Sequence, residues 1–342
     1  MNDTVRMSLD EIHVLAVETL QANGCSEAQA RAIADTVTAA ERDGAKSHGL
    51  WRIPFYAKAI RGSGAVPDAE PEITDLAPGV VAIDGQYGFA PLALQMGAEP
   101  LAERARSQGI AALAVRHVFH IAALWPEVER LAEQGLVAIA MTGAISYVAP
   151  AGGTEPLYGT NPMAFAWPRE DRPPLVFDQA SAASARGEIQ LHLREGRPIP
   201  EGWAVGPDGQ PTTDPETALA GAQLPFGGHK GAAIALMVEL LAGALIDDLF
   251  SYEAADADPN RVGAPLGGEF IIAIDPARCA ADGDRSARLR KAEELFTRIL
   301  QQEGTRLPGQ KRHAQREASR AEGVDVSVSI RDEVIALRDS PA

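Results

Sequence analysis

The chain has 342 residues, of which 46% are hydrophobic and 23% are charged, and its formal net charge is −16 at pH 7. This balance is typical of a globular protein with one large core or two modest ones. The acidic excess argues against nucleic acid or an anionic membrane as a partner. Cys25 and Cys279 fit no metal-type or disulfide-type spacing, so we expect reduced thiols and no metal site.

The first part of the chain is predicted to be helical. Ser8 and Glu11 fit a capping box, and apolar residues then recur at helical spacing as far as the stop at residues 23–24. Ser26 is the expected cap of a second helix, which runs toward a turn at residues 43–44. These helices lead directly into the segment that carries the most chemistry.

That segment, residues 47–52, contains a hydroxyl, an imidazole and a guanidinium on Ser47, His48 and Arg52. If its backbone is helical, His48 and Arg52 lie four positions apart on one face. A guanidinium can bind a carboxylate through two parallel hydrogen bonds, and an imidazole beside it can donate a proton to the next atom of the same molecule. The pattern therefore predicts chemistry one bond away from a carboxylate, on a 2-oxo or 2-imino acid.

From about residue 80 the pattern changes to short apolar runs separated by helical stretches. The expected strands are residues 80–83, 110–115, 136–141, 163–167, 175–177 and 270–274, and the expected helices between them include residues 90–107 and 125–134. This mixture predicts an α/β (α+β) fold.

The expected domain division joins the two ends of the chain. We expect a helical segment at residues 284–303 to rejoin the N-terminal helices, which predicts a helical lobe of residues 1–75 with 284–342 and an α/β domain of residues 76–283. The apolar window 232–246 is short for a membrane span and contains Glu239, so it is expected to be a buried helix. Because no secretory signal is visible either, we expect a cytoplasmic protein with no membrane partner.

Two segments are candidates for phosphate binding, although the chain has neither a GxGxxG fingerprint nor a GxxxxGK[ST] loop. The glycine-rich residues 225–231 contain His229 and Lys230 and open the apolar helix, whose first N–H groups attract anions. A basic cluster at residues 306–313 could hold the phosphate that distinguishes NADP. The ordinary alternatives are a surface turn for residues 225–231 and a solvated loop for residues 306–313.

Other polar positions follow turns and strands. Thr160 lies in a turn at residues 158–162, and Asp178 follows an apolar strand, where a carboxylate can hold a ribose hydroxyl. Glu188 could orient an imidazole, with an exposed loop acid as the alternative. His120, near a strand end, has no convincing third metal ligand nearby in the sequence, so no metal is inferred.

Taken in order, these segments resemble the malate/L-lactate dehydrogenase superfamily that lacks a Rossmann fold. The likeness runs from about residue 8 to residue 330. Residues 40–45, 122–129 and 224–241 most resemble, within it, the NADPH-dependent reductases of Δ1-piperideine-2-carboxylate and Δ1-pyrroline-2-carboxylate. The resemblance implies a non-Rossmann NAD(P)-binding domain with a mixed sheet, next to the helical lobe.

The resemblance also implies a role for each matching position. His48 matches the proton donor, Ser47 and Glu188 match the groups that relay charge to it, and Arg52 and Thr160 match the contacts with the substrate carboxylate. Relatives usually carry Asp where Glu188 stands, so the longer side chain must move its carboxylate. The implied cofactor-binding positions are His120, Ile121, Ala122, Ala123, Leu124, Asp178, Gln179, Ala180, His229, Lys230, Arg306, Leu307, Pro308, Gly309, Gln310, Lys311 and Arg312.

The implied activity is NADPH-dependent reduction of cyclic 2-imino acids to L-pipecolate and L-proline, carried out by a homodimer without a metal. The nearest alternative is an NAD(P)-dependent 2-hydroxy-acid dehydrogenase of the malate or lactate type. The alternative of another class is a non-catalytic ligand-binding homologue.

Overall fold

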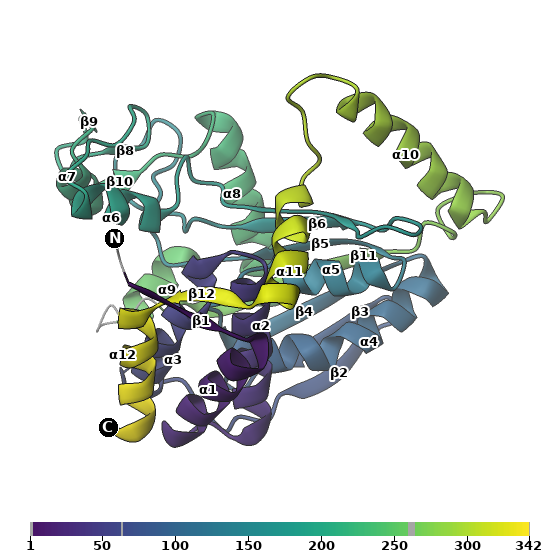
Figure 1. Ribbon diagram of the computed structural model, residues 1–342. Helices are drawn as coiled ribbons and strands as arrows, with labels where there is room; N and C mark the ends of the chain where they lie inside the picture. The colour runs from purple at the N-terminus through teal and green to yellow at the C-terminus, as the bar shows by residue number, and fades with distance from the viewer. Residues whose placement is uncertain (1–2, 63, 259–263, 342) are drawn as a thin grey trace.

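A seven-stranded sheet forms the centre of the protein, whose computed structural model describes residues 3–62, 64–258 and 264–341 (Figure 1). In spatial order its strands are β2 (Glu72–Ala77), β3 (Val80–Asp84), β4 (Ile110–Phe119), β11 (Leu266–Ile274), β5 (Val137–Thr142), β6 (Met163–Trp167) and β7 (Leu175–Gln179). Among these strands β3 and β4 pair in parallel, and all other neighbours are antiparallel. The mixed α/β fold is confirmed, and a sheet with so few parallel pairs has no place for the Rossmann fingerprint.

Side chains alternate between the two faces of the sheet along each strand, and different helices cover the two faces. In β11, Ile271 and Ala273 pack in the core that includes α4 (Ala90–Gln108) and α5 (Trp125–Glu133). Phe270 and Ile272 point to the opposite face, where they pack with α8 (His229–Ala242). Figure 1 shows α8 on one side of the sheet and α4 and α5 on the other.

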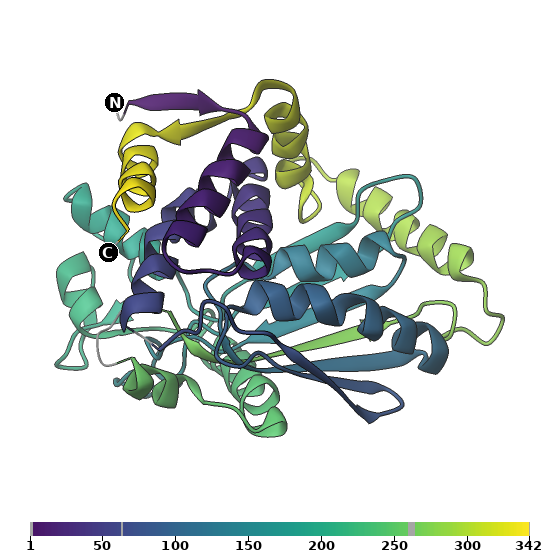
Figure 2. The same cartoon turned by 90° about the horizontal axis from the view of Figure 1, so that it is seen from below.

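Helices from both ends of the chain form a layer that contacts α4. This layer contains α1 (Leu9–Ala22), α2 (Glu27–Arg42), α3 (Ile53–Gly62) and α12 (Val328–Asp339), and it is closed by antiparallel pairing of β1 (Thr4–Met7) with β12 (Val324–Ser327) (Figure 2). The predicted capping box is confirmed, because the Ser8 N–H donates to Glu11 Oε2 at 2.7 Å and the Glu11 N–H donates to Ser8 Oγ at 3.2 Å. The layer therefore begins where the sequence predicts.

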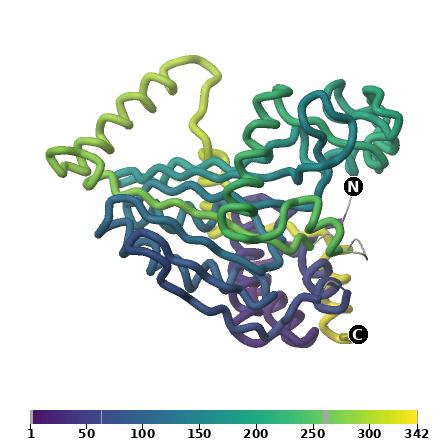
Figure 3. Tube along the Cα trace, turned by 180° about the vertical axis from the view of Figure 1, so that it is seen from behind, coloured from purple at the N-terminus to yellow at the C-terminus, as the bar shows by residue number. Residues whose placement is uncertain are grey.

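The expectation that residues 284–303 rejoin the N-terminal helices is wrong for α10 (Arg285–Leu300). Phe296 of this helix packs against Leu175 at the β6–β7 edge of the sheet. Figure 3 shows α10 in light green as an arm on the side of the molecule away from the purple N-terminal helices. The chain returns to its start through α11 (Gln310–Glu322), β12 and α12. The cause of the difference is the apolar edge of the sheet, whose location the linear pattern does not reveal.

A small unit beside α8 has its own core, which the sequence analysis did not separate from residues 76–283. Its elements are α6 (Arg186–Arg194), β8 (Ala204–Val205), β9 (Pro211–Thr212), α7 (Pro215–Ala220) and β10 (Ala222–Gln223). Ile189, Ile199 and Ala218 are buried together inside it. The unit escaped prediction because strands of two residues show no periodicity. The short elements η3 (Ala244–Ile246) and α9 (Ser251–Ala257) follow α8.

Helix α8 with η3 is apolar and long enough, by length and composition alone, to cross a membrane. It instead packs on the sheet, where it buries Val238 and the carboxylate-bearing Glu239. The expectation of a buried helix holds for this inner face. Leu236, Met237 and Leu240 on the other side are exposed, so the helix is only half covered.

Candidate active site

The segment that carries His48 and Arg52 consists of two 3₁₀ turns, η1 (Lys46–His48) and η2 (Leu50–Arg52), and not of the α-helical turn on which the prediction depended. Gly49 separates the two turns with φ −84° and ψ −145°. The Glu41 carboxylate accepts the Leu50 N–H at 2.9 Å. A Cβ at position 49 would lie 2.1 Å from Glu41 Oε1, so this carboxylate occupies the space that any larger residue would need.

His48 and Arg52 lie together despite the different backbone. Ser47 Oγ is 3.1 Å from His48 Nδ1, and Arg52 Nε donates to the Ser47 carbonyl at 2.7 Å. Burial, and then the charges of Arg52 and His120, lower the pKa of His48 to about 3. Within the described residues, no group accepts a hydrogen bond from the two Nη atoms of Arg52. Both Nη atoms are therefore available to a carboxylate.

Thr160 lies in the loop before β6, where the buried Asn161 holds the backbone at φ 38°. The Asn161 amide donates to Glu239 Oε1 at 2.8 Å, and its Oδ1 accepts the Ser251 hydroxyl at 3.1 Å. The sequence analysis missed this network. The feature that could have indicated it is Glu239, a glutamate inside an apolar helix. The loop that presents Thr160 is thus fastened to α8. No described contact joins the Thr160 side chain to Arg52.

Three of the four segments expected to bind a cofactor meet at the start of α5. Asp178, in β7, accepts the N–H groups of Leu124 and Trp125 at 3.0 and 3.1 Å. The Arg312 guanidinium lies 4.4 Å from the centre of the Trp125 ring. Burial lowers the pKa of Arg312, and its Nη1 atom is buried without a hydrogen-bond partner among the described residues. Residues 120–124, 178–180 and 306–312 are therefore neighbours, with one unused guanidinium nitrogen between them.

The fourth segment, the glycine-rich turn before α8, lies beside the chain that leaves β7. The Phe226 N–H donates to the Ser181 carbonyl at 3.0 Å. Gly228 caps α8 with φ 62°, a conformation that favours glycine. His229 and Lys230 are exposed in the first turn of the helix. The N–H groups of Lys230 and Gly231 already donate to the Gly227 and Phe226 carbonyls, so this end of α8 offers chiefly the exposed His229 and Lys230 side chains.

Glu188 is not placed beside His48. It lies in the first turn of α6 with a half-exposed side chain, and its Oε1 is 3.7 Å from Nε2 of His192, one helical turn further on. None of the contacts described for Glu188 reaches His48. The other end of α6 does approach the segment, because the Arg194 guanidinium is 5.8 Å from the centre of the Trp51 ring. Ser47 contacts His48 directly, whereas the relay role of Glu188 stays a prediction.

His120 has a buried partner that the sequence analysis missed. Its Nε2 lies 3.0 Å from Glu269 Oε2, and both side chains are buried. His117 has a structural environment instead, with its ring stacked on Tyr87 and its Nδ1 2.9 Å from Asp84. The two histidines near the end of β4 therefore differ in their roles.

Comparisons of the sequence and of the fold with known proteins point to the same family. The malate/L-lactate dehydrogenase family matches residues 7–334. A Δ1-pyrroline-2-carboxylate/Δ1-piperideine-2-carboxylate reductase of Pseudomonas aeruginosa is 51% identical over 97% of this chain and 99% of its own. A (2R)-3-sulfolactate dehydrogenase (NADP⁺) of Chromohalobacter salexigens is 42% identical over 96% of this chain and 97% of its own.

A crystal structure of Δ1-piperideine-2-carboxylate reductase from Pseudomonas syringae pv. tomato is similar in fold, with a TM-score of 0.92, 39% identity, and coverage of 98% of this chain and 100% of that chain. These relatives also confirm the narrower resemblance to reductases of cyclic imino acids. Because the family match spans nearly the whole chain and the full length of its relatives, this chain belongs to the malate/L-lactate dehydrogenase family.

Proposed function

We propose that this protein is an NADPH-dependent reductase of cyclic 2-imino acids, which converts Δ1-piperideine-2-carboxylate to L-pipecolate and Δ1-pyrroline-2-carboxylate to L-proline. The observation that carries the proposal is that the Arg52 guanidinium, whose two Nη atoms have no hydrogen-bond acceptor among the described residues, lies beside the partly exposed imidazole of His48. His120, the first residue of the neighbouring cofactor segments, interacts electrostatically with His48. Relatives that are 44–51% identical are named as reductases of these substrates.

The chemistry follows from where the substrate carboxylate docks. Arg52 binds the carboxylate through its two Nη atoms, with Thr160 as a second contact. The imine carbon is bonded to the carboxylate carbon, so this docking brings the C=N bond to His48. His48, held at Nδ1 by Ser47, then donates a proton to the imine nitrogen. Pairing Arg52 with an anion also removes one of the charges that depress the His48 pKa.

The residues present fit a nicotinamide dinucleotide. The unpartnered Nη1 of Arg312 and the start of α8 with His229 and Lys230 are suited to phosphate groups. Residues 120–124, 178–180 and 306–312 form the wall between them, and the positive charge of Lys311 and Arg312 supports NADPH over NADH. When bound, the nicotinamide supplies the hydride that reduces the imine carbon.

The test is a panel of both cyclic imines with both nicotinamide cofactors, followed by the absorbance of the reduced cofactor. We expect consumption of NADPH with each imine and slower consumption of NADH. Activity restricted to 2-oxo acids would favour the 2-hydroxy-acid dehydrogenase, an alternative supported by the sulfolactate dehydrogenase relative. Cofactor binding without turnover on any substrate would favour the non-catalytic homologue.

Arg52→Lys is expected to lower kcat/KM for either imine by about 10–100-fold, mainly through KM, because lysine cannot form the two parallel hydrogen bonds. Steady-state kinetics with saturating NADPH measure the change. Arg61→Lys, on the exposed end of α3, is the matched control and should retain the original values. An unchanged KM in Arg52→Lys would mean that another cation binds the carboxylate.

We also propose that the protein acts as a homodimer in the cytoplasm. The exposed side chains Leu236, Met237, Leu240 and Leu245 give the outer side of α8 and η3 an apolar surface, and such surfaces commonly mark contacts between protein chains. The buried inner face of α8 supports a role for this helix in a folded core and not in a membrane.

A further inference from the structure

Ser181 joins three segments of the proposed site. It directly follows the proposed cofactor-binding residues 178–180 and is buried, with 1% of its surface exposed. Its N–H donates to the Thr160 carbonyl at 2.7 Å, and its hydroxyl donates to the Asn161 carbonyl at 2.7 Å. Its own carbonyl accepts the Phe226 N–H from the glycine-rich turn at 3.0 Å. Each polar group of this serine thus binds a segment other than its own.

The loop that Ser181 holds has an uncommon backbone. Asn161 is fully buried and lies at φ 38°, a region that few residues other than glycine adopt. Its side-chain amide donates to the Ala235 carbonyl at 3.0 Å and to Glu239 Oε1 at 2.8 Å, both on α8. The loop is therefore attached to α8 by a side chain and to Ser181 by its main chain. Because Thr160 immediately precedes Asn161, its position depends on both attachments.

The contact between Ser181 and the glycine-rich turn requires glycine at position 231. A Cβ at Gly231 would lie 2.8 Å from the Ser181 carbonyl oxygen and 2.5 Å from the Phe226 carbonyl oxygen. The Gly231 N–H instead donates to this Phe226 oxygen at 2.9 Å. The turn at residues 225–231 is thus packed against the same serine that holds the substrate loop.

The hydroxyl of Ser181 is the contact that a substitution can remove by itself. Its N–H and carbonyl belong to the main chain, so the bonds to Thr160 and Phe226 remain available in an alanine variant. Loss of the hydroxyl takes a donor from the buried Asn161 carbonyl, and a buried polar group that loses its partner is costly. The loop then gains a reason to move, whereas the glycine-rich turn does not.

We propose that Ser181 is a positioning residue for substrate binding that acts through Thr160. The inference rests on the proposed function, because it takes Thr160 as a contact of the substrate carboxylate. By fixing the Asn161 carbonyl, the hydroxyl holds Thr160 in a constant place relative to the cofactor-binding residues 178–180. The carboxylate bound by Arg52 and Thr160 is then oriented with respect to the cofactor.

Ser181→Ala tests this role. We expect KM for either imine to rise about three- to tenfold, the effect of one lost hydrogen bond, with kcat within about twofold. The dissociation constant for NADPH should not change, because the main-chain bond to Phe226 is kept. A merely structural role would not confine the change to KM. Ser181→Cys has nearly the same shape and a weaker donor, so it should show the same kind of increase if the alanine variant does not fold.

A double-mutant cycle with Thr160→Val shows whether Ser181 acts through Thr160. Thr160→Val removes the proposed carboxylate contact and should raise KM by itself. If the serine only positions Thr160, Ser181→Ala should raise KM no further in the Thr160→Val background. Equal increases of KM in the two backgrounds would overturn the proposal.

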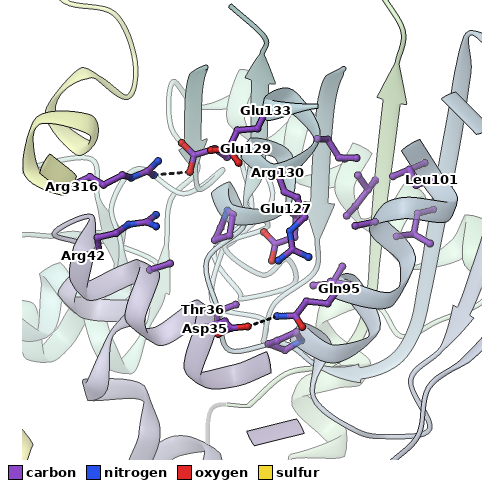
Figure 4. A pocket seen from close by; sticks show the side chains of 18 of the residues that line it. Asp35, Thr36, Arg42, Gln95, Leu101, Glu127, Glu129, Arg130, Glu133 and Arg316 are labelled. Atoms are coloured by element: carbon purple, nitrogen blue, oxygen red, sulfur yellow. Dashed lines mark hydrogen bonds and ion pairs between the residues drawn. The ribbon is translucent and has the colours of Figure 1, made fainter. Parts of the chain in front are cut away.

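Two buried or half-buried hydroxyls serve as matched controls. The Ser184 hydroxyl lies three residues further on, and it donates to the carbonyl of the next residue, Ala185, at 3.0 Å. The Thr36 hydroxyl donates to the Ile33 carbonyl at 2.8 Å on α2, where Thr36 lines a separate cavity of about 340 Å³ between α2, α4, α5 and α11 (Figure 4). Ser184→Ala and Thr36→Val should both keep the original KM.

An unchanged KM in Ser181→Ala, in a protein that reduces the imines, would also overturn the proposal. If the unmodified protein reduces neither imine, the proposed function fails, and calorimetric titration with pyridine-2-carboxylate in the presence of NADPH decides on Ser181. This planar carboxylate should bind more weakly to Ser181→Ala than to Ser184→Ala. Equal affinities, or no binding to the unmodified protein, would reject the positioning role. Thermal unfolding of each variant separates lost folding from lost binding.

Discussion

Replacing His48 with asparagine is expected to lower kcat for cyclic-imine reduction by about 10²–10⁴-fold, the usual contribution of general acid catalysis. Asparagine keeps a polar group near Ser47 Oγ but cannot deliver a proton to the imine nitrogen. Affinity for NADPH should change little, because the cofactor segments are fastened by separate contacts around Asp178. Steady-state kinetics and a fluorescence titration with NADPH measure the two effects independently.

His13→Asn is the matched control for this experiment. His13 lies on α1, where its Nε2 is 3.0 Å from Asp35, away from the 47–52 segment. Its replacement should leave both kcat and NADPH affinity unchanged. Full activity in His48→Asn would assign the donated proton to water or to another side chain.

The depressed pKa of His48 also predicts how stability depends on pH. Between its unfolded pKa of about 6.5 and its folded pKa of about 3, the unfolded chain binds a proton at His48 that the folded chain does not. Stability from this residue is therefore present above pH 6.5 and is lost progressively as the pH falls toward 3. His48→Asn should lose less stability than the unmodified protein when urea unfolding is compared at neutral pH and at about pH 4.5.

Replacing Arg316 with methionine is expected to destabilise the fold by about 3–5 kcal/mol, the usual cost of removing one partner from a buried ion pair. Arg316 on α11 donates to both oxygens of Asp43 at 2.9 and 2.6 Å and to Glu129 Oε2 at 2.6 Å. Without it, two buried carboxylates from α5 and the end of α2 face each other, with Arg42 left to pair with Asp43. Denaturant unfolding measures the loss.

Arg320→Met provides the comparison, because Arg320 lies one turn further along α11 and is exposed. Burial raises the pKa of Asp43, but hydrogen bonds from Arg316 and Arg42 outweigh it and bring the pKa below its ordinary value. Stability from such a carboxylate is present above its unfolded pKa and is lost as the pH falls through the folded value. The Arg316→Met deficit should therefore be largest at neutral pH and shrink in acid. Equal losses in the two variants would contradict this account.

Local signals explain which parts of the fold could be predicted. The capping box at Ser8 and Glu11 is complete within four residues, and the apolar run 163–167 is the same length as β6. Packing partners are not local. Nothing in the sequence around Phe296 indicates that this side chain packs on Leu175 rather than on α1. The order of the strands likewise needed the structure, since β11 enters between β4 and β5 from far along the chain.

The candidate site likewise has parts that could be predicted from local sequence and parts that could not. Ser47, His48 and Arg52 could be grouped because they are adjacent in sequence, although 3₁₀ turns and not an α-helix bring them together. Glu188 lies far from His48 in sequence, and its described neighbour is His192, four residues further on in the same helix, so its predicted relay role stays a prediction. The partnership of His120 with Glu269 links β4 to β11 across the sheet and has no signature along the chain.

The lack of room for a side chain at Gly49 has a consequence for how this architecture can diversify. A substitution there would force the Glu41 carboxylate out of its place and break the hydrogen bond that the Leu50 N–H donates to it. The Glu41 side chain thus favours glycine at position 49, between the turn that carries His48 and the turn that carries Arg52. A change of substrate preference is therefore expected at positions other than residue 49.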